Sequence, residues 1–420
     1  MLGLNVPENT LLGDFLQKRR ARNEAAQTSE TTEFDATIDA TAATNTIAAG
    51  APQTDEAPSH TPTDEDADPN RSDANTISPD ASASNAHAQD NHTPAVVSLG
   101  QVWVDIMMNV DDLPASGGFT IANNTTPALG GSYRVLQAAS AMGAPTEHAG
   151  IVGSGVWASL VRNTFADDGI RHTGPDRLDA DSGFRLVFHD GTGHKTFVAN
   201  YGAEAQGNEA TFDAMEPGRG DVVHMSGNTL LDHTAAGIDE FIHRAGTDPK
   251  QRAWHLVINP TNTLRLVNDH LLEDLVLARP IWSCNRQEAQ TLADRLGVFV
   301  DDSASLTVNG GFDKSMEALC EALGETLRAP LVVRAGSRGA WVRRPGCPVR
   351  HIEGFPTKAV HTRSAGGCHT GVMCAMLLRG WGLEDATHIA NAAASLAIQR
   401  SVNGVPVPPS YEEALALVEQ

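Results

Sequence analysis

The sequence has few aromatic residues, only 5% of its 420 residues, and it is also short of positive charge. Lys and Arg number 30 against 52 Asp and Glu, so the formal charge is -22 at pH 7. This excludes nucleic acid polymers and anionic membranes as general partners, because both bind through clustered Lys and Arg. With 41% hydrophobic residues, the chain can still build a core, one rich in Ala, Val and Leu.

Cysteine pairs, long apolar runs and a signal sequence are also missing. The cysteines are odd in number and form no CxxC pair, which indicates reduced thiols; they are Cys284, Cys320, Cys347, Cys368 and Cys374. No run approaches the roughly 18 apolar residues of a membrane span. In Met1–Arg20 the basic residues follow the apolar ones, the reverse of a signal peptide. We therefore expect a cytoplasmic protein with no membrane segment.

The N-terminal 94 residues differ in composition from the rest. Residues 26–94 hold 13 acidic residues, one Arg and almost no large apolar residues. Such a segment buries too little surface to offset its chain entropy, so we expect a disordered acidic tail. Within residues 1–25, an amphipathic pattern around Leu11–Leu16 precedes basic residues. It is either a short helix that docks on a protein partner or a frayed terminus.

Beyond residue 94, segments of strand and helix character alternate. Strands are expected at Val96–Leu99, Thr146–Val152, Asp221–Met225, His255–Ile258, Pro280–Trp282 and Pro330–Arg334. Helices are expected near residues 135–142, 156–168, 234–245, 263–277, 286–296, 313–327 and 385–400. Such alternation predicts a mostly parallel sheet with helices on both faces.

Two segments, near residues 106–127 and 184–201, interrupt this alternation. The first is polar and contains glycine. The second holds two apolar runs on either side of Asp190–Gly193, the pattern of a β-hairpin. We expect both segments to form a small β layer that projects from the sheet as a lid.

A turn of small residues, Ser364–Gly367, precedes an apolar helix expected over Cys368–Arg379. A helix that is apolar on most faces is typically buried. Glycine at a helix N-terminus leaves backbone N–H groups free to point at one place, together with the positive end of the helix dipole. The turn therefore predicts an anion site, most often one for phosphate.

Further motifs surround this turn in a fixed order along the chain. They are Gly130-Gly131 before an Ala-rich helix, V-G-S-G-V-W-A-S-L-V at 152–161, H-K-T-F-V-A-N-Y-G-A-E-A at 194–205, S-C-N-R-Q-E-A at 283–289, V-V-R-A-G-S-R-G-A-W-V at 332–342 and A-N-A-A-A-S-L-A at 390–397. In this order they resemble the ribokinase-like, or PfkB type, carbohydrate kinases. The resemblance implies one kinase domain over residues 95–420, a three-layer α/β/α fold with a mostly parallel sheet and a small projecting β lid.

Members of this family use ATP and Mg²⁺ to phosphorylate a hydroxymethyl group of a sugar, nucleoside or related polyol. The resemblance assigns cofactor binding to Ala365, Gly366, Gly367, Arg334, Gly336, Ser337, Gly339 and Asn391. It assigns substrate contacts to Asp105, Gly130, Gly131 and Arg134, and a metal role to Asn285 and Glu288. It also implies a sugar-like or nucleoside ligand and a homodimer formed through the lid.

The catalytic aspartate of the family is missing from this sequence. The signature D-T-x-G-A-G-D aligns without gaps on His361–Gly367, which puts Gly367 at the base position, and no Asp or Glu occurs from Phe355 to Leu383. A general base contributes about 10²–10⁴-fold. His361 and His369 are alternative acceptors or ordinary histidines. Helix positions two apart point about 200° from each other, so His369 is expected to face elsewhere.

Several other assigned residues carry two interpretations each. Asp105, just after the first expected strand, is either a substrate-hydroxyl acceptor or a turn cap. Arg334 stands where the family usually has Thr, and it either contacts a phosphate or blocks it. Asn285 and Glu288 either help to hold Mg²⁺ through water or form a helix N-cap with an acidic third residue.

Different hypotheses of function follow from these departures. In the first, the chain is an active kinase with an unusual proton acceptor. In the second, it is a catalytically impaired or dead relative that still binds nucleotide or sugar. In the third, it is a protein that uses the fold only structurally. The missing acceptor at Gly367 favours the impaired relative over an active kinase.

Overall fold

The computed structural model describes residues 92–244, 246–300, 311–360, 362, 364–402 and 405–420. The helix predicted within residues 1–25 and the acidic tail predicted up to residue 91 lie outside these described residues, as does His361. At the start of the described residues, His92 Nε2 lies 2.8 Å from a carboxylate oxygen of Asp221.

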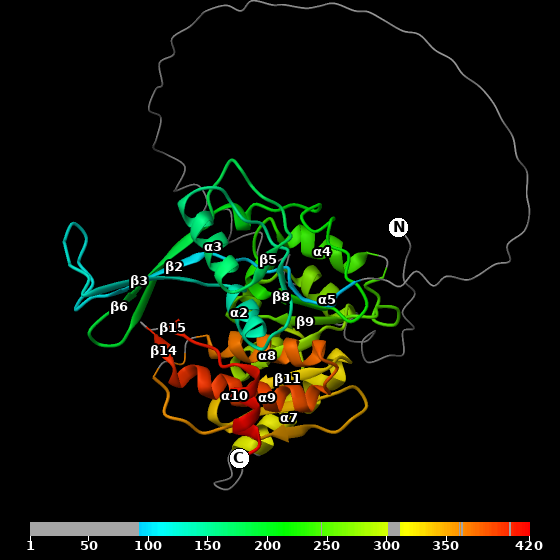
Figure 1. The fold of residues 1–420 in the computed structure, drawn as a ribbon. Coiled ribbons are helices and arrows are strands. Elements are labelled where there is room, and N and C mark those ends of the chain that lie inside the picture. Colours follow the sequence, from blue (N-terminus) through cyan, green and yellow to red (C-terminus); the bar gives the residue numbers. More distant parts are fainter. Residues whose placement is uncertain (1–91, 245, 301–310, 361, 363, 403–404) are drawn as a thin grey trace, which may run out of the picture. The chain divides into compact units, whose positions relative to one another are not determined.

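A nine-stranded sheet forms the centre of the described residues (Figure 1). Its strands, in spatial order, are β13 (Arg350–Ile352), β12 (Ala340–Arg343), β11 (Leu331–Arg334), β10 (Ile281–Asn285), β9 (His255–Asn259), β8 (Val222–Ser226), β1 (Val96–Ser98), β4 (Thr146–His148) and β5 (Ile170–His172). Each pair of neighbouring strands from β11 to β5 is parallel. Strand β12 is antiparallel to both of its neighbours, β11 and β13. The strand order reverses at β1, and in α/β sheets ligands bind beyond the carboxyl ends of the strands near such a reversal.

The helices fall into two groups by their contacts, as expected for the two faces of a sheet. One group contains α2 (Tyr133–Ala141), α8 (Ala365–Leu378), α9 (Leu383–Gln399) and α10 (Tyr411–Val418). The other contains α4 (Ala235–His243), α5 (Asp269–Leu277), α6 (Arg286–Arg295) and α7 (Gly311–Leu327), while α3 (Val156–Asp167) packs on β5. The predicted α/β fold class, with its mostly parallel sheet, is confirmed.

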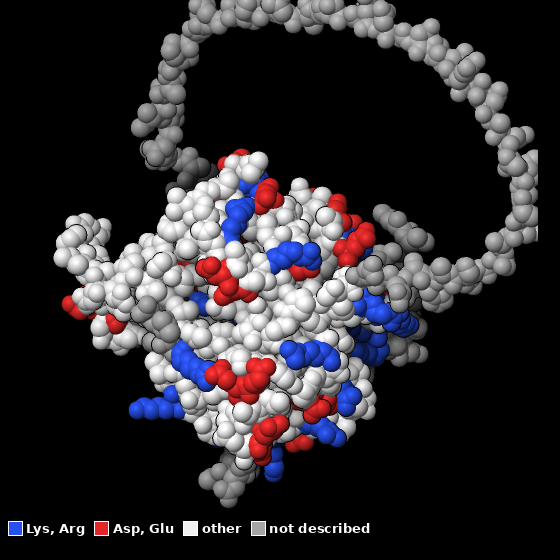
Figure 2. All heavy atoms as spheres, viewed as in Figure 1, with Lys and Arg blue, Asp and Glu red and all other residues white. Residues whose placement is uncertain are grey.

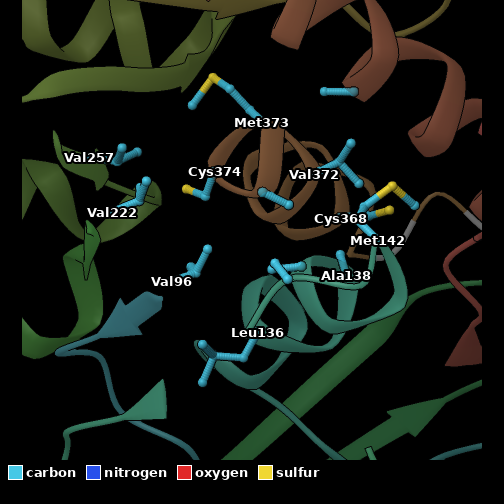
Figure 3. Close-up of a cluster of buried hydrophobic side chains, with 14 of the residues drawn as sticks. Val96, Leu136, Ala138, Met142, Val222, Val257, Cys368, Val372, Met373 and Cys374 are labelled. Carbon is cyan, nitrogen blue, oxygen red and sulfur yellow. The ribbon is translucent and has the colours of Figure 1, made fainter. Parts of the chain in front are cut away.

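Helix α8 is the most deeply buried helix in the first group, with every residue from 368 to 377 buried. Its side chains pack between α2 and the sheet (Figure 3), among them Cys368, Val372, Met373 and Cys374 of α8, Leu136, Ala138 and Met142 of α2, and Val96, Val222 and Val257 of the strands. Full burial of a Val, Leu or Met side chain contributes about 1.5–3 kcal/mol. This packing fixes the direction in which the N-terminus of α8 points.

A second sheet of four strands projects from the main one (Figure 1). Its spatial order is β3 (Asn124–Leu129), β2 (Val104–Asn109), β6 (Phe184–His189) and β7 (Lys195–Asn200). Strands β6 and β7 form the hairpin that the sequence predicts. Strand β2 begins before the predicted lid segment and pairs in parallel with β6. We call these four strands the lid sheet.

Some predicted boundaries are wrong for local reasons. The helix predicted over 263–277 is split into a 3₁₀ turn, Asn262–Leu266, and α5, because the Asn268 side chain accepts a hydrogen bond from the backbone N–H of His270 and starts a new helix. Helix α8 begins at Ala365, three residues before its predicted start, because Ser364 takes the left-handed φ of 60° and the small residues that follow are already helical.

Charged side chains of both signs are interspersed on the face of the described residues shown in Figure 2. This distribution agrees with the small share of basic residues and with the absence of a basic stripe on that face. None of the described helices is long and apolar enough to cross a membrane.

Candidate functional site

A cavity of about 660 Å³ lies between β11, α8 and α9, within the range of 300–1,000 Å³ typical of small-molecule sites. All the residues assigned to the nucleotide, the metal and the base line it: Asn285, Glu288, Arg334, Gly336, Ser337, Gly339, Ala365, Gly366, Gly367 and Asn391. We call it the large cavity. The residues assigned to the substrate, Asp105, Gly130, Gly131 and Arg134, are not among its lining residues.

The N-terminus of α8 opens onto the large cavity at Ala365, Gly366 and Gly367. The first N–H groups of a helix have no partner within the helix, and Ala365 N makes only a long contact of 3.4 Å with Thr362 O. These groups and the positive end of the helix dipole make the place suited to an anion.

Arg334 is buried beside this helix start, and its donors are used within the protein. Nη1 donates to Gly366 O at 2.6 Å and to Thr370 Oγ1 at 3.3 Å, and Nε donates to Cys284 O at 3.2 Å. Nη2 approaches Ser283 O and Glu288 Oε2 at 3.3 and 3.5 Å. The guanidinium therefore joins β10, β11 and α8. Burial lowers the pKa of Arg334, and Glu288 opposes that shift.

Asn285 and Glu288 form a complete capping box at the start of α6. The Asn285 side chain accepts from Glu288 N, and Glu288 Oε2 accepts from Asn285 N, both at 2.8 Å. The same Glu288 oxygen faces Arg334. This cap agrees with the structural interpretation of the pair, and because both residues also line the large cavity it leaves their metal role open.

The loop between β11 and β12 depends on glycine at two positions. Gly336 and Gly339 have φ of 61° and 86°, in the left-handed region. A Cβ on Gly339 would meet Ile352 O at 2.1 Å, so the loop lies in close contact with the end of β13 and the residues just after it. Asn391 of α9 holds the same chain, because its Nδ2 donates to Ile352 O and Glu353 O.

His369 and Gly367 face different neighbours. His369 Nε2 donates to Asn391 Oδ1 of α9 at 3.1 Å, whereas a Cβ on Gly367 would meet Arg134 Cβ of α2 at 3.0 Å. Burial lowers the pKa of His369 to about 3. The histidine is therefore a weak base, and its side chain is directed away from the one that position 367 would carry.

Asp105 lies within strand β2 of the lid sheet, not in the turn after β1. Its carboxylate accepts a bidentate pair from Arg185 of β6, at 2.8 and 2.9 Å, and a hydrogen bond from Trp103 Nε1 at 2.9 Å. The turn-cap interpretation is therefore wrong. Gly130 leaves room for this arrangement, because a Cβ there would meet Trp103 Nε1 at 2.6 Å and Asp105 Oδ2 at 3.0 Å.

A second cavity, of about 180 Å³, lies beside this ion pair. Trp103, Arg185, Glu204 and Asp232 line it with residues of β6 and β7, and we call it the lid cavity. Burial raises the pKa of both Glu204 and Asp232. No residue lines both the lid cavity and the large cavity in the described part of the chain.

The bulky residues that follow the glycine pair point away from the lid cavity. Tyr133 Oη donates to Asp168 Oδ2 at 2.5 Å, and its ring stacks near Phe165 of α3. Arg134 is buried, and its Nη1 donates to Gln137 Oε1 at 3.1 Å. Gly131, with φ of 66°, passes close to Trp103.

Comparison with known proteins identifies the class. The fold is that of the ribokinases: ribokinase from Cryptococcus neoformans in complex with ADP has a TM-score of 0.63 at 16% identity, covering 78% of this chain and 100% of that one. Ribokinase from Arabidopsis thaliana, complexed with ribose and ATP, has a TM-score of 0.61 at 19% identity with the same coverage. Residues 93–408 match the pfkB family carbohydrate kinases, and the chain belongs to this family.

The curated relatives match over nearly their whole length. The uncharacterized sugar kinase YegV of Escherichia coli is 28% identical over 325 residues, which is 76% of this chain and 93% of the relative. Ribokinase from Haemophilus influenzae is 24% identical over 327 residues, which is 76% of this chain and 97% of the relative.

Several lining residues were missed by sequence reasoning. In the large cavity these are Asn259, Phe355, Thr357, Ala359, Ala394, Ser395 and Ile398. Helical spacing from Asn391 would have found the last three, at the third, fourth and seventh positions after it. In the lid cavity Trp103, Arg185, Glu204 and Asp232 were missed, and no local pattern marks them.

Proposed function

We propose that this chain binds ATP in the large cavity and a sugar-like or nucleoside molecule beside the lid sheet, and that it transfers the phosphoryl group poorly or not at all. The observation that carries the proposal concerns position 367. Every residue assigned to the nucleotide and metal lines the large cavity, while the place of the proton acceptor is Gly367.

The polar end of the large cavity suits phosphates. Backbone N–H groups at Gly366 and Gly367 and the dipole of α8 supply positive potential. Arg334 acts through the backbone, because it holds Gly366 O and so fixes the orientation of this helix turn. The guanidinium neither blocks the N-terminus nor keeps a donor for a phosphate, since each of its nitrogens donates within the protein.

The other end of the large cavity suits a nucleotide base. Phe355, Ala394 and Ile398 give it apolar walls, and Ser395 and Asn391 lie on the same face of α9. An apolar slot with a few fixed polar groups is the usual form of such a site.

The residues at the start of α6 fit a magnesium ion that arrives with the phosphates. Mg²⁺ is usually bound by one or two carboxylates together with phosphate oxygens and water. Glu288 Oε2 is used by the capping box and by Arg334, which leaves Oε1 for a water of the ion. When bound, the ion would neutralise phosphate charge during transfer.

The proton of the acceptor hydroxyl lacks a partner at this site. Glu288 is the one carboxylate among the described residues that line the large cavity, and it is held by Arg334. His369 is a weak base that faces α9. We therefore expect transfer to be slower by the roughly 10²–10⁴-fold that a general base contributes.

An active kinase with a different acceptor is the alternative. Burial raises the pKa of both Asp232 and Glu204, which makes each a stronger base than an exposed carboxylate. Both, however, line the lid cavity, which shares no described residue with the large one. Glu204 also accepts hydrogen bonds from Gly183 N and Gly202 N, so this alternative has the weaker support.

The remaining parts of the proposal concern assembly and location. Phe197 and Val198 on β7 are more than half exposed, at 51% and 55%, which supports a homodimer formed through the lid sheet. The composition of residues 1–94 supports a protein partner for the tail, and the lack of paired cysteines supports a cytoplasmic location.

Two measurements on the full chain test this proposal together: calorimetric titration with Mg-ATP and an assay of sugar phosphorylation. The titration should show one site, and Gly339→Ala should weaken ATP binding, because the glycine has φ of 86° and no room for a Cβ. Gly346→Ala, at an open position with φ of 74°, is the matched control. Undetectable binding at millimolar ATP would exclude the nucleotide role, whereas tight binding with fast sugar phosphorylation would exclude the impairment.

A further inference from the structure

Helices α4 and α5 pack against each other on the side of the chain drawn in green in Figure 1. Each presents a histidine and an aspartate four residues apart: Asp239 and His243 on α4, and His270 and Asp274 on α5. Residues at this spacing share one face of a helix. We propose that Asp239, His243 and Asp274 bind a zinc ion that joins the two helices.

The distances suit a tetrahedral metal site. One ligand atom from each of Asp239, His243 and Asp274 lies within 4.8 Å of the others. His243 Nε2 is 3.6 Å from Asp274 Oδ1. In a tetrahedral site with ligands about 2.0–2.1 Å from zinc, neighbouring ligand atoms lie about 3.3 Å apart. The 3.6 Å between His243 Nε2 and Asp274 Oδ1 is close to that spacing.

The hydrogen bond on the far side of His243 determines which nitrogen faces the cluster. Nδ1 lies 2.8 Å from the backbone oxygen of Asp239 and 3.4 Å from its carboxylate Oδ1, and since a carbonyl only accepts, Nδ1 carries a proton. Nε2 of the neutral ring is then a lone-pair acceptor, and it faces a carboxylate oxygen of Asp274. Either a proton or a metal cation between these two atoms would satisfy both, and we assign the cation. A metal-binding histidine commonly has this second hydrogen bond to a carbonyl.

Asp274 is the most buried of the four groups, with its side chain 14% exposed. His270 Nδ1 lies 2.8 Å from Asp274 Oδ2, and His243 Nδ1 lies 3.4 Å from Asp239 Oδ1, so each carboxylate already has an imidazole beside it. His243 is 54% exposed and His270 is 78% exposed. Solvent can therefore reach the cluster, and the fourth zinc position is open to water.

The donor set favours zinc over magnesium or calcium. A neutral imidazole with two carboxylates is a common ligand combination for zinc, whereas Mg²⁺ and Ca²⁺ prefer all-oxygen sites. The cluster lies apart from both cavities, since no residue of α4 or α5 lines either one. We expect the ion to stabilise the packing of α4 on α5, with no part in phosphoryl transfer.

Zinc titration of the full chain after chelator treatment tests the proposal. We expect one zinc per chain by isothermal titration and elemental analysis, with a rise in the unfolding temperature that grows with zinc concentration. His243→Gln and Asp274→Asn should each weaken binding at least about tenfold, as losses around zinc sites do, and should abolish the rise in unfolding temperature.

The chain has 16 histidines, so the variants need a matched control. His351→Gln removes an imidazole bonded to Arg338 O at a distant strand and should bind zinc like the parent. If neither the parent nor the control binds zinc at micromolar concentrations, the cluster holds only ion pairs and the proposal is wrong. Equal binding by the parent and by His243→Gln and Asp274→Asn would place the zinc elsewhere and would also overturn it. Unfolding curves without zinc show whether each variant is folded.

Discussion

Arg134 of α2 packs directly against Gly367 of α8: a Cβ on Gly367 would lie 3.0 Å from the Cβ of Arg134. Real Cβ atoms seldom approach so closely, so a side chain at 367 requires α2 to give way by a few tenths of an ångström. The space for a side chain at 367 is therefore limited by the Cβ at position 134. Replacing the glycine alone does not recreate an unstrained site.

A double-mutant cycle measures this contact. Gly367→Ala adds only a Cβ, and we expect it to destabilise the parent through overpacking by about 1–2 kcal/mol. In the Arg134→Gly background the opposing Cβ is gone, so the same change should be less destabilising by about 1 kcal/mol. Urea unfolding of the four chains gives the coupling. Additive effects would show that the helices do not touch at this point.

Arg334 offers a second prediction, because lysine cannot replace a planar fork with five donors. Arg334→Lys should leave some of the acceptors at Ser283, Cys284, Gly366 and Thr370 without a donor. We expect a loss of about 2–3 kcal/mol in the free energy of unfolding and weaker ATP binding. Urea unfolding and calorimetry measure both.

The matched control for Arg334→Lys is Arg338→Lys, further along the same loop. Arg338 and its partner Asp313 are more than half exposed, at 57% and 53%, and exposed pairs contribute about 0–1 kcal/mol. If the two lysine variants lose equal stability, the buried hydrogen bonds of Arg334 do not stabilise the fold more than an exposed ion pair does.

The pair between Asp105 and Arg185 leads to a third prediction. Arg185→Met should destabilise the lid sheet by about 3 kcal/mol, because it leaves Asp105, whose side chain is 7% exposed, without its cation. Arg177→Met removes a cation from an exposed pair with Asp179 and should change stability little. Protease resistance of the lid sheet and urea unfolding report the difference. A stable Arg185→Met variant would contradict the prediction.

The free energy of unfolding should fall in mild acid. Burial lowers the pKa of His148, His224 and His369 to about 3, from 6.5 in an exposed histidine. Between these values the unfolded chain binds more protons than the folded one, so stability is lost as the pH falls from 6.5 toward 3. At pH 5 each buried histidine contributes a loss of about 2 kcal/mol.

Urea unfolding at pH 7 and pH 5 tests this, with His224→Asn to remove one of the three groups. The asparagine side chain would neither gain a charge in acid nor lose much volume, so the fall in stability between the two pH values should shrink by about 2 kcal/mol. His194→Asn, in an exposed turn where the side chain is 84% exposed, should leave the fall unchanged. Equal stability of the parent at pH 7 and pH 5 would contradict the burial of these rings.

The sequence was sufficient for the mostly parallel main sheet, because alternating apolar segments of the right lengths follow one another from Val222 to Arg334. It was not sufficient for the strand pairing within the lid sheet, where β2 pairs with β6 about 80 residues later. The role of Asp105 follows from that pairing. No local pattern in the sequence indicates that β2 pairs with a strand so far along the chain.

The large cavity was more predictable than the lid cavity for a physical reason. Its lining includes turns and helix starts, such as Gly336–Gly339 and Ala365–Gly367, whose small residues belong to the motifs that carry the family resemblance. The hydrogen-bond partners of Arg334 could not be predicted from the sequence. Whether its guanidinium donates to a phosphate or to backbone carbonyls, such as Gly366 O, depends on the packing around it.

The central claim is that the nucleotide site persists while the proton acceptor is gone at Gly367. Its most direct test is the steady-state turnover of the full chain with Mg-ATP across a panel of sugars and nucleosides, at ATP concentrations where calorimetry shows the site filled. We predict turnover below about 10⁻² s⁻¹ with every compound, since a typical enzyme reaches about 1 s⁻¹ or more and a missing base lowers the rate by about 10²-fold or more. Turnover of about 1 s⁻¹ or faster with any of them would contradict the claim.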